Sequence, residues 1–226
     1  MKCAYCGEEL RGMFKKDLHG FGAHPEHAFQ CFSCQRFVAS TDHRLPDGRY
    51  QCADCMQKEV KTDKHVEWVE TRVKQMLAAH GIDKWPSSVP IRLIQPRYTP
   101  GRPATQAHKM GETKVAKSIF SKSYEVNMLN HMHRIVFGGV LAHELLHVWQ
   151  YERNIYLRSE LTEGFCNLGS WIVYKHMATP VSQAMMTILE RDPTPVYGDG
   201  FRIVKAVYDN LANGSLPDVM SQLKKM

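Results

Sequence analysis

The apolar positions of this chain recur at helical spacing in one early segment and throughout the second half. In the early segment they lie three or four residues apart, at Val66, Val69, Val73 and Leu77. This spacing places them on one face of a helix over about residues 60–80, and Gly81 is typical of a helix end. From His131 onward the same pattern predicts helices over about 132–152, 159–178, 181–191, 199–213 and 216–225.

The stretch between these helical regions has a pattern that is typical of β-strands. The segment IRLIQ at 91–95 predicts a strand, and prolines at 96, 100 and 103 mark the loop that follows. Residues 104–109 and 114–128 also have strand character. We therefore expect a small, mostly antiparallel sheet followed by a helical half, which together make an α+β fold.

The first 58 residues differ from the rest because they hold six of the seven cysteines and little continuous apolar sequence. So short a segment cannot bury a core of its own and is typical of a domain that a metal stabilises. We therefore divide the chain into a zinc-binding domain over 1–58, a connecting helix over 59–81 and a second domain over 82–226.

Composition and charge add limits to this picture. The 43% of hydrophobic residues is ordinary for a globular protein, and no signal-peptide core or membrane-length apolar run is present, so we expect a cytoplasmic protein without membrane contact. The basic excess lies between Arg92 and Arg134. A solvated surface explains it, and attraction of acidic substrates or partners is the alternative. Without a nucleic-acid-binding motif, nucleic acid is not an expected partner.

The segment HELLH carries the candidate chemistry. Its histidines, His143 and His147, are four residues apart, so on a helix both imidazoles can reach one metal ion. Glu144 lies beside that face, where it can take a proton from zinc-activated water. A chance match, or two ordinary core histidines, is the alternative interpretation. The pattern favours a zinc hydrolase, and a suitable third ligand would strengthen that prediction.

A catalytic zinc site has three protein ligands and one open position, and the chain offers a third ligand downstream. Glu163 is our candidate, because a turn between two antiparallel helices would return it to the histidines, and Glu160 is the rival. We expect Ser159 to cap the second helix and Gly164 to let that helix pack closely beside the HELLH helix. Asn167, on the same face as Glu163, is expected to hydrogen-bond a ligand histidine.

Hydrolysis of a peptide also requires a donor to the oxyanion that forms on the substrate. Tyr197, in PVYGDGF before a predicted helix, is our candidate for this role. Weaker candidates are His108, His131, His133 and Tyr208. Cys166 is expected to be an ordinary core residue.

The N-terminal cysteines and histidines form four pairs, each with two residues between its members. The pairs are Cys3 and Cys6, His24 and His27, Cys31 and Cys34, and Cys52 and Cys55. Eight ligands in four pairs predict two closed tetrahedral zinc sites, the first formed by the first two pairs and the second by the last two. With the catalytic ion, the sequence predicts three zinc ions per chain.

This spacing resembles a LIM domain, as do the HPE before the central ligands and the DGRY before the last pair. A LIM domain usually has cysteine where His27 stands, and one residue fewer before Cys31. A LIM domain ahead of an HExxH peptidase resembles the LIM-domain peptidase family known in plants as ubiquitin-activated regulators of organ size. The segments LAHELLHVW, TEGFC and PVYGDGFR are similar to segments of that family.

The resemblance implies a zincin-like endopeptidase of the gluzincin type, with His143 and His147 as zinc ligands and Glu144 as the catalyst. It favours Glu163 as the third ligand. A protein or peptide would be the substrate, and the LIM module would bind a partner or substrate. Plant members carry ubiquitin-interacting motifs ahead of the LIM domain, and none is seen here. Ubiquitin is therefore a partner by resemblance only, and a shorter relative, such as a bacterial one, is a plausible identity. A non-catalytic LIM adaptor and a hydrolase of small peptides or amides are the alternatives.

Overall fold

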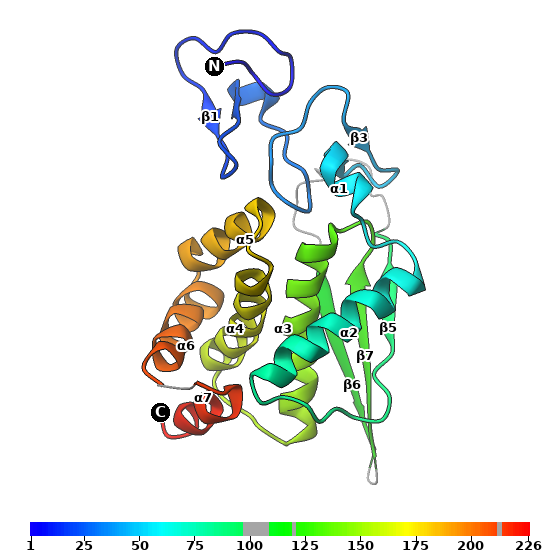
Figure 1. Ribbon diagram of the computed structural model, residues 1–226, viewed down its shortest axis with the longest axis vertical. Coiled ribbons are helices and arrows are strands. Elements are labelled where there is room, and N and C mark those ends of the chain that lie inside the picture. Colours follow the sequence, from blue (N-terminus) through cyan, green and yellow to red (C-terminus); the bar gives the residue numbers. More distant parts are fainter. Residues whose placement is uncertain (97–108, 119–120, 212–213) are drawn as a thin grey trace.

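The computed structural model describes residues 1–96, 109–118, 121–211 and 214–226. In it the chain forms an N-terminal part of short hairpins, which lies on one end of a larger part made of a sheet and helices (Figure 1). This arrangement is an α+β fold. The predicted strand near 104–109 falls, but for Lys109, outside the described residues, and so does His108.

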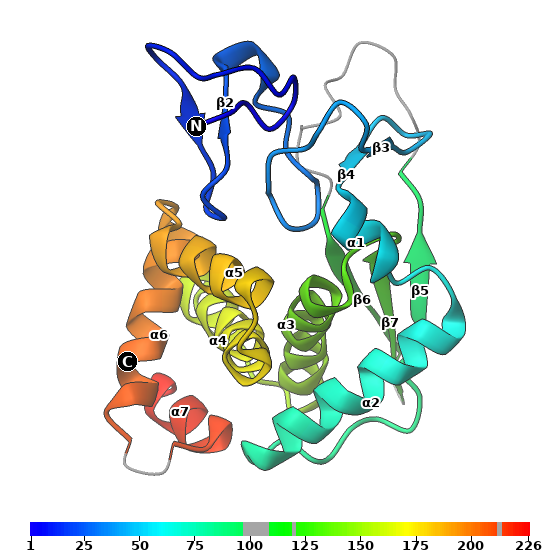
Figure 2. The same cartoon turned by 45° about the horizontal axis from the view of Figure 1, so that its top comes forward.

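The N-terminal part contains two small antiparallel sheets and little else that is regular. Its elements are β1 (Lys15–Lys16) paired with β2 (Gly22–Ala23), a 3-10 turn at Pro25–His27, β3 (His43–Arg44) paired with β4 (Tyr50–Gln51), and α1 (Ala53–Gln57). It has two small buried clusters, one of four cysteines with Val38 and the other of Cys3, Ala23 and Phe37. Figure 2 shows β2 on the side of α5 and β3–β4 on the side of α1, so this part has two halves. So small an apolar core is typical of a domain that needs bound metal for its stability.

The larger part contains a three-stranded mixed sheet. Its strands are β5 (Ile91–Ile94), β6 (Gly111–Lys117) and β7 (Lys122–Leu129), in the order β5-β7-β6. β7 pairs parallel to β5 and antiparallel to β6, so the sheet is mixed rather than mostly antiparallel. The prediction of a single strand over 114–128 was wrong, because this range comprises the end of β6 and most of β7. No glycine or proline marks the turn between them, so the pattern alone predicts one strand.

The helices agree closely with the predicted ranges. They are α2 (Asp63–Ala79), α3 (Arg134–Glu152), α4 (Ser159–Met177), α5 (Pro180–Arg191), α6 (Gly200–Asp209) and α7 (Leu216–Leu223). Side-chain caps set several of the helix starts: Thr62 accepts from the backbone of His65, and Thr179 forms a capping box with Ser182. α6 ends before the predicted 213, and the residues ahead of it form a separate π-helical turn, Pro195–Asp199.

α3 is the central helix of the molecule. It lies between α4 on one side and α2 and the sheet on the other (Figure 1), and most of its side chains are buried. α4 runs antiparallel to it, because Ser170 bonds the carbonyl of Gly139 while Tyr174 bonds that of Val136. A helix buried on nearly all sides is expected to be apolar all round, so the polar residues of HELLH stand out against this background.

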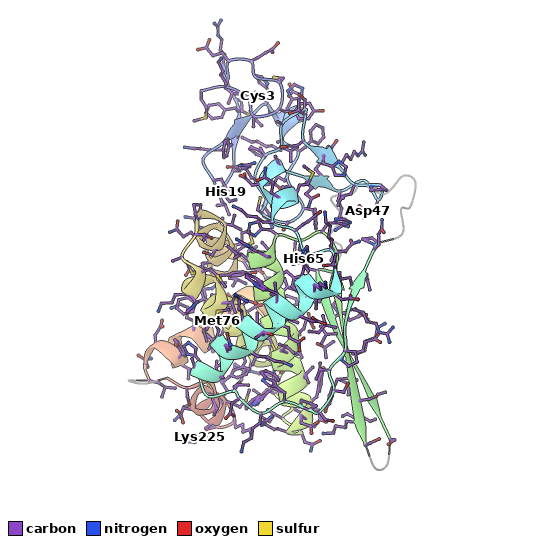
Figure 3. All side chains as sticks on the ribbon, turned by 45° about the vertical axis from the view of Figure 1, so that its right-hand side comes forward. Cys3, His19, Asp47, His65, Met76 and Lys225 are labelled. Carbon is purple, nitrogen blue, oxygen red and sulfur yellow. The ribbon has the colours of Figure 1, made fainter. Side chains whose placement is uncertain are left out.

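The N-terminal part is joined to the larger part around the start of α3. Backbone bonds link Val60 to Met132 and His131, at 2.8 and 2.9 Å, and the amide of Arg134 donates to Lys58 at 2.8 Å. Figure 3 shows Cys3 at the end of the N-terminal part farthest from the helices, and Asp47 on the side of the sheet. The second half of the N-terminal part therefore meets the helix that carries HELLH. None of the described helices offers a stretch that could cross a membrane.

Candidate metal centres

Three groups of cysteine and histidine side chains within the described residues could hold a metal ion. They are Cys3, Cys6, His24 and His27; Cys31, Cys34, Cys52 and Cys55; and His143, His147 and Cys166. In each group the donor atoms lie within 4.8 Å of one another. Two of the groups are the four-residue sets predicted from the sequence, and the third adds Cys166 to the histidines of HELLH.

Distances in the two N-terminal groups match those between ligands of one tetrahedral zinc ion. Two sulfur ligands at roughly 2.3 Å from zinc lie about 3.8 Å apart, and a sulfur and a nitrogen ligand about 3.6 Å apart. The Sγ atoms of Cys34 and Cys52 are 3.7 Å apart. Cys6 Sγ lies 3.6 Å from His24 Nδ1, and Cys3 Sγ lies 3.8 Å from His27 Nδ1. The cysteines of both groups are free of disulfides, and the soft donor sets suit zinc.

The third centre lies between α3 and α4. The Nε2 atoms of His143 and His147 are 3.1 Å apart, and Glu163 Oε2 lies 3.1 Å from the first and 3.4 Å from the second. Nitrogen or oxygen ligands of one tetrahedral zinc ion, each at roughly 2.0–2.1 Å, are separated by about 3.3 Å. Burial raises the pKa of Glu163, but hydrogen bonds from the two histidines outweigh it and leave that pKa well below its usual value. An ionised carboxylate therefore faces two imidazole nitrogens at ligand spacing.

Cys166 lies on the same side of α4 but in a different environment. Its thiol is fully buried, accepts a hydrogen bond from Gln150 at 3.1 Å, and has a pKa that burial raises well above its usual value. The predicted core position of Cys166 agrees with this burial. The rival candidate Glu160 lies in the first turn of α4, where Ser159 donates to its carboxylate at 3.3 Å.

Hydrogen bonds orient one histidine and connect it to a distant segment. The Nδ1 of His143 lies 2.9 Å from Asn167 Oδ1. When Nδ1 donates this hydrogen bond, Nε2 carries no proton and is free to bind a metal ion. Asn167 Nδ2 in turn donates to the carbonyl of Tyr197 at 3.2 Å. The Nδ1 of His147 is buried and has no hydrogen-bond partner among the described residues. One side chain of α4 thus holds both a histidine of α3 and the segment before α6.

Glu144 is buried and held by the edge strand β6. The hydroxyl of Thr113 donates to Glu144 Oε2 at 2.7 Å and also lies 3.0 Å from the carbonyl of Glu144. A Cβ at Gly111 would stand 2.8 Å from the Glu144 side chain and 2.7 Å from Val140, so only glycine allows this approach without a shift. The sequence did not reveal Thr113 or Gly111, because no spacing along the chain relates them to HELLH.

A cleft of about 450 Å³ contains the third centre. Its floor consists of two facing stripes, with Val136, Val140, His143 and His147 on α3 and Glu163, Asn167, Ser170 and Tyr174 on α4. α5 adds Met185, Ile188 and Leu189, so the end of the cleft toward the start of α3 is apolar. Gln35 of the N-terminal part also borders the cleft. The cleft is thus polar at the histidines and apolar toward the N-terminal part.

Tyr197 borders the same cleft, whereas three of the weaker candidates, His131, His133 and Tyr208, lie elsewhere. Tyr197 is 44% exposed, and its pKa is raised by the charge of Glu163 and then by burial. The ring of His131 lies 2.8 Å from Glu59, His133 caps α3, and the hydroxyl of Tyr208 lies 3.4 Å from His80. These three residues therefore make contacts within the fold and do not border the cleft.

Two expectations about α4 were wrong. Ser159 is the first helical residue rather than the cap, because Arg158 occupies the N-cap position and makes no side-chain cap bond. Gly164 does permit a close approach, but to α6 rather than α3: a Cβ there would lie 2.3 Å from the carbonyl of Gly200. Gly169 provides the close contact with α3, at Leu146. Three helices meet at α4, and the sequence does not show which glycine faces which helix.

Several described basic residues of the 92–134 region have nearby partners. Arg92 pairs with Glu125 at 2.7 Å, and Lys122 donates to Asn154 at 2.8 Å. A solvated surface accounts for these pairs, and attraction of acidic partners stays a prediction.

Comparisons of the chain with protein-family models, curated proteins and solved structures found no match. A functional assignment therefore depends on the geometry of the three centres.

Proposed function

We propose that this chain is a zinc endopeptidase that hydrolyses protein substrates at the centre between α3 and α4. The main support is the triangle formed by the Nε2 atoms of His143 and His147 and the Oε2 of Glu163, whose sides of 3.1, 3.1 and 3.4 Å fit three ligands of one tetrahedral ion. Three protein ligands leave one open position, which is typical of catalytic rather than structural zinc.

Glu163 is a better candidate than Cys166 for the third zinc ligand. Zinc binds a thiolate, and the fully buried environment of Cys166 raises the pKa of its thiol and so opposes loss of the proton. Glu163 is already ionised and lies at ligand distance from both histidines. Asn167 orients His143 through Nδ1, an arrangement that is typical of histidine ligands.

The side chains around the proposed site can supply the remaining functions of a peptidase. Zinc bound there would lower the pKa of a bound water molecule and polarise the scissile carbonyl. Thr113 bonds Oε2 of Glu144, so Oε1 can take a proton from water and later give it to the leaving amine. The hydroxyl of Tyr197, at the rim of the cleft, is our candidate donor to the oxyanion of the substrate.

The shape of the cleft favours a peptide over a small amide. β6 is an edge strand of the described sheet, and Gly111 and Thr113 of this strand border the cleft. An extended peptide can add to a free strand edge through its backbone, which would bring it alongside Glu144. The apolar end of the cleft, beyond Val140, is suited to an apolar side chain of such a peptide.

We further propose that residues 1–58 form a LIM-like module with two structural zinc ions. Cys3, Cys6, His24 and His27 would bind the first, and Cys31, Cys34, Cys52 and Cys55 the second, at the distances described above. Four ligands close each site, so these ions would stabilise the fold and take no part in hydrolysis. The module would bind a protein partner or substrate. Ubiquitin is the first partner to test, because the family that the chain resembles is activated by ubiquitin.

The decisive experiment compares the wild type with Glu144→Gln on a fluorescence-quenched peptide library and on denatured casein, in the presence of zinc. We expect hydrolysis by the wild type and a loss of about 10²–10⁴-fold in Glu144→Gln, because the amide cannot take the proton. Glu160→Gln changes a glutamate of α4 outside the proposed ligand set and should retain activity. Equal inertness of wild type and Glu144→Gln, with zinc bound and with ubiquitin added, would instead favour a LIM adaptor.

A further inference from the structure

The N-terminal part contains two metal-binding turns that repeat the same backbone pattern. We call them turn 1 (residues 3–8) and turn 2 (residues 31–36). In turn 1 the amide of Gly7 donates to the carbonyl of Cys3 at 2.9 Å, and in turn 2 the amide of Gln35 donates to Cys31 at 2.9 Å. The amide of each first cysteine donates back to the residue five positions on, at 2.7 Å in turn 1 and 2.8 Å in turn 2.

The two turns differ at the residue that follows the second cysteine. Both residues there have left-handed backbone, with φ of 77° at Gly7 and 61° at Gln35. Glycine adopts this conformation without strain, whereas a residue with a Cβ does so at a cost. Turn 1 therefore has the residue that the backbone favours, and turn 2 keeps a long polar side chain at a strained position. Strain of this kind is common where a side chain serves a binding site.

Gln35 borders the cleft of the proposed catalytic site. Its neighbours Cys34 and Arg36 instead line a second cavity, of about 740 Å³. The carboxamide of Gln35 makes no hydrogen bond to any described residue, and Gln35 is only half-buried. A residue with an uncommitted carboxamide thus lies at the border of the cleft.

Turn 2 is fixed in this position by contacts with the helices on both sides of the cleft. The backbone amide of His133, the cap of α3, donates to the buried hydroxyl of Ser33 at 2.8 Å. On the other side, Val181 of α5 packs against the buried cluster of Cys31, Cys34, Cys52 and Cys55. The loop that carries turn 2 descends toward α5 and the start of α3 (Figures 1 and 2). The second metal centre therefore holds Gln35 at a constant place relative to the cleft.

We propose that Gln35 binds the substrate: its carboxamide hydrogen-bonds a backbone amide group of a peptide in the cleft. This inference rests on the proposed peptidase function. A carboxamide both donates and accepts, so it matches the N–H and C=O of an extended peptide of any sequence. The LIM-like module is then one wall of the substrate site, and its second metal centre positions a residue that contacts substrate.

The test uses Gln35→Gly, because glycine restores the residue found in turn 1 and removes only the side chain. The probe is the quenched library peptide that the wild type cleaves fastest. We expect KM to rise about 5- to 10-fold, the effect of one lost hydrogen bond, with kcat within about twofold and without loss of thermal stability. A fluorescein-labelled copy of this peptide should bind Glu144→Gln more tightly, by the same factor, than it binds the Glu144→Gln, Gln35→Gly double variant.

Two further variants separate substrate binding from a structural role. Gln35→Asn keeps a carboxamide and tolerates the left-handed backbone, so it should recover part of the affinity. Arg36→Ala alters the neighbouring residue of turn 2, which faces the second cavity, and should leave KM unchanged. An unchanged KM in Gln35→Gly, or an equal rise in Arg36→Ala, overturns the role of Gln35 while the peptidase function stands. Absence of hydrolysis by the wild type overturns both.

Discussion

The guanidinium of Arg49 donates to the backbone carbonyl of Asn130 at 3.0 Å and to its side-chain oxygen at 2.8 Å. Arg49 belongs to the N-terminal part, and Asn130 lies four residues before the first residue of α3. The same guanidinium pairs with the buried carboxylate of Asp47 at 2.8 Å and stacks over the ring of Phe32. One buried arginine therefore fastens the N-terminal part to the start of the helix that carries HELLH.

Replacing Arg49 by methionine should destabilise the protein strongly. The substitution keeps much of the side-chain volume but removes the positive charge beside the buried Asp47, and such a loss costs about 3–5 kcal/mol. Urea denaturation in the presence of zinc measures the change. Arg44→Met removes an exposed arginine of the same hairpin and should cost under about 0.5 kcal/mol. Similar stabilities for the two variants would show that the buried contact does not join the two parts.

Metal analysis should find three zinc ions per chain. We expect mild chelation to remove the ion with three protein ligands and to leave the two ions with four. Glu163→Ala should reduce the count to two, whereas Glu160→Ala and Cys166→Ala should retain three. If Cys166→Ala lost one ion and Glu163→Ala lost none, Cys166 rather than Glu163 would be the third ligand.

Thr113→Val should lower kcat by roughly tenfold, because it removes the hydrogen bond that holds Glu144 Oε2. Valine has nearly the shape of threonine, so the packing of β6 against α3 is retained. Steady-state kinetics on the library peptide would show the loss in kcat rather than in KM. Thr113→Ser keeps the hydroxyl and should restore most of the rate. Full activity in Thr113→Val would mean that the bond has no part in catalysis.

His133 should make the protein less stable in mild acid. Burial, and then the charges of Lys58 and Arg134, lower the pKa of His133 from 6.5 to about 4, so the folded state disfavours its protonated form. The unfolded chain binds this proton first as the pH falls, so the stability that His133 contributes is complete above pH 6.5 and is lost toward pH 4. At roughly 1.4 kcal/mol per unit, the loss is of the order of 3 kcal/mol.

His133→Asn provides the comparison for this pH dependence. Asparagine retains a cap for the amide of Ile135 but does not titrate in this range. Thermal denaturation between pH 4 and 7 should show a smaller decrease for the variant than for the wild type. Parallel curves would assign the acid sensitivity to other groups, such as the cysteine ligands.

The sequence by itself determined the features that depend on local geometry. A helix of 3.6 residues per turn puts His143 and His147 on one face wherever it packs, and the two-residue spacing within each Cys or His pair lets both members reach one ion. Apolar periodicity likewise located the helices. The sequence also predicts that the helix with Glu163 runs antiparallel to the HELLH helix, which would bring Glu163 near the histidines, because only a short connection joins the two helices.

Only the tertiary structure decided which side chains from distant segments meet at the cleft. The approach of Thr113 to Glu144 depends on the absence of a Cβ at Gly111, and the place of Gln35 depends on how turn 2 docks on α3. The same limit explains the errors at β6–β7 and at Gly164. Pairing and close packing are contacts between segments that are far apart in the chain, and no periodicity along a single segment encodes them.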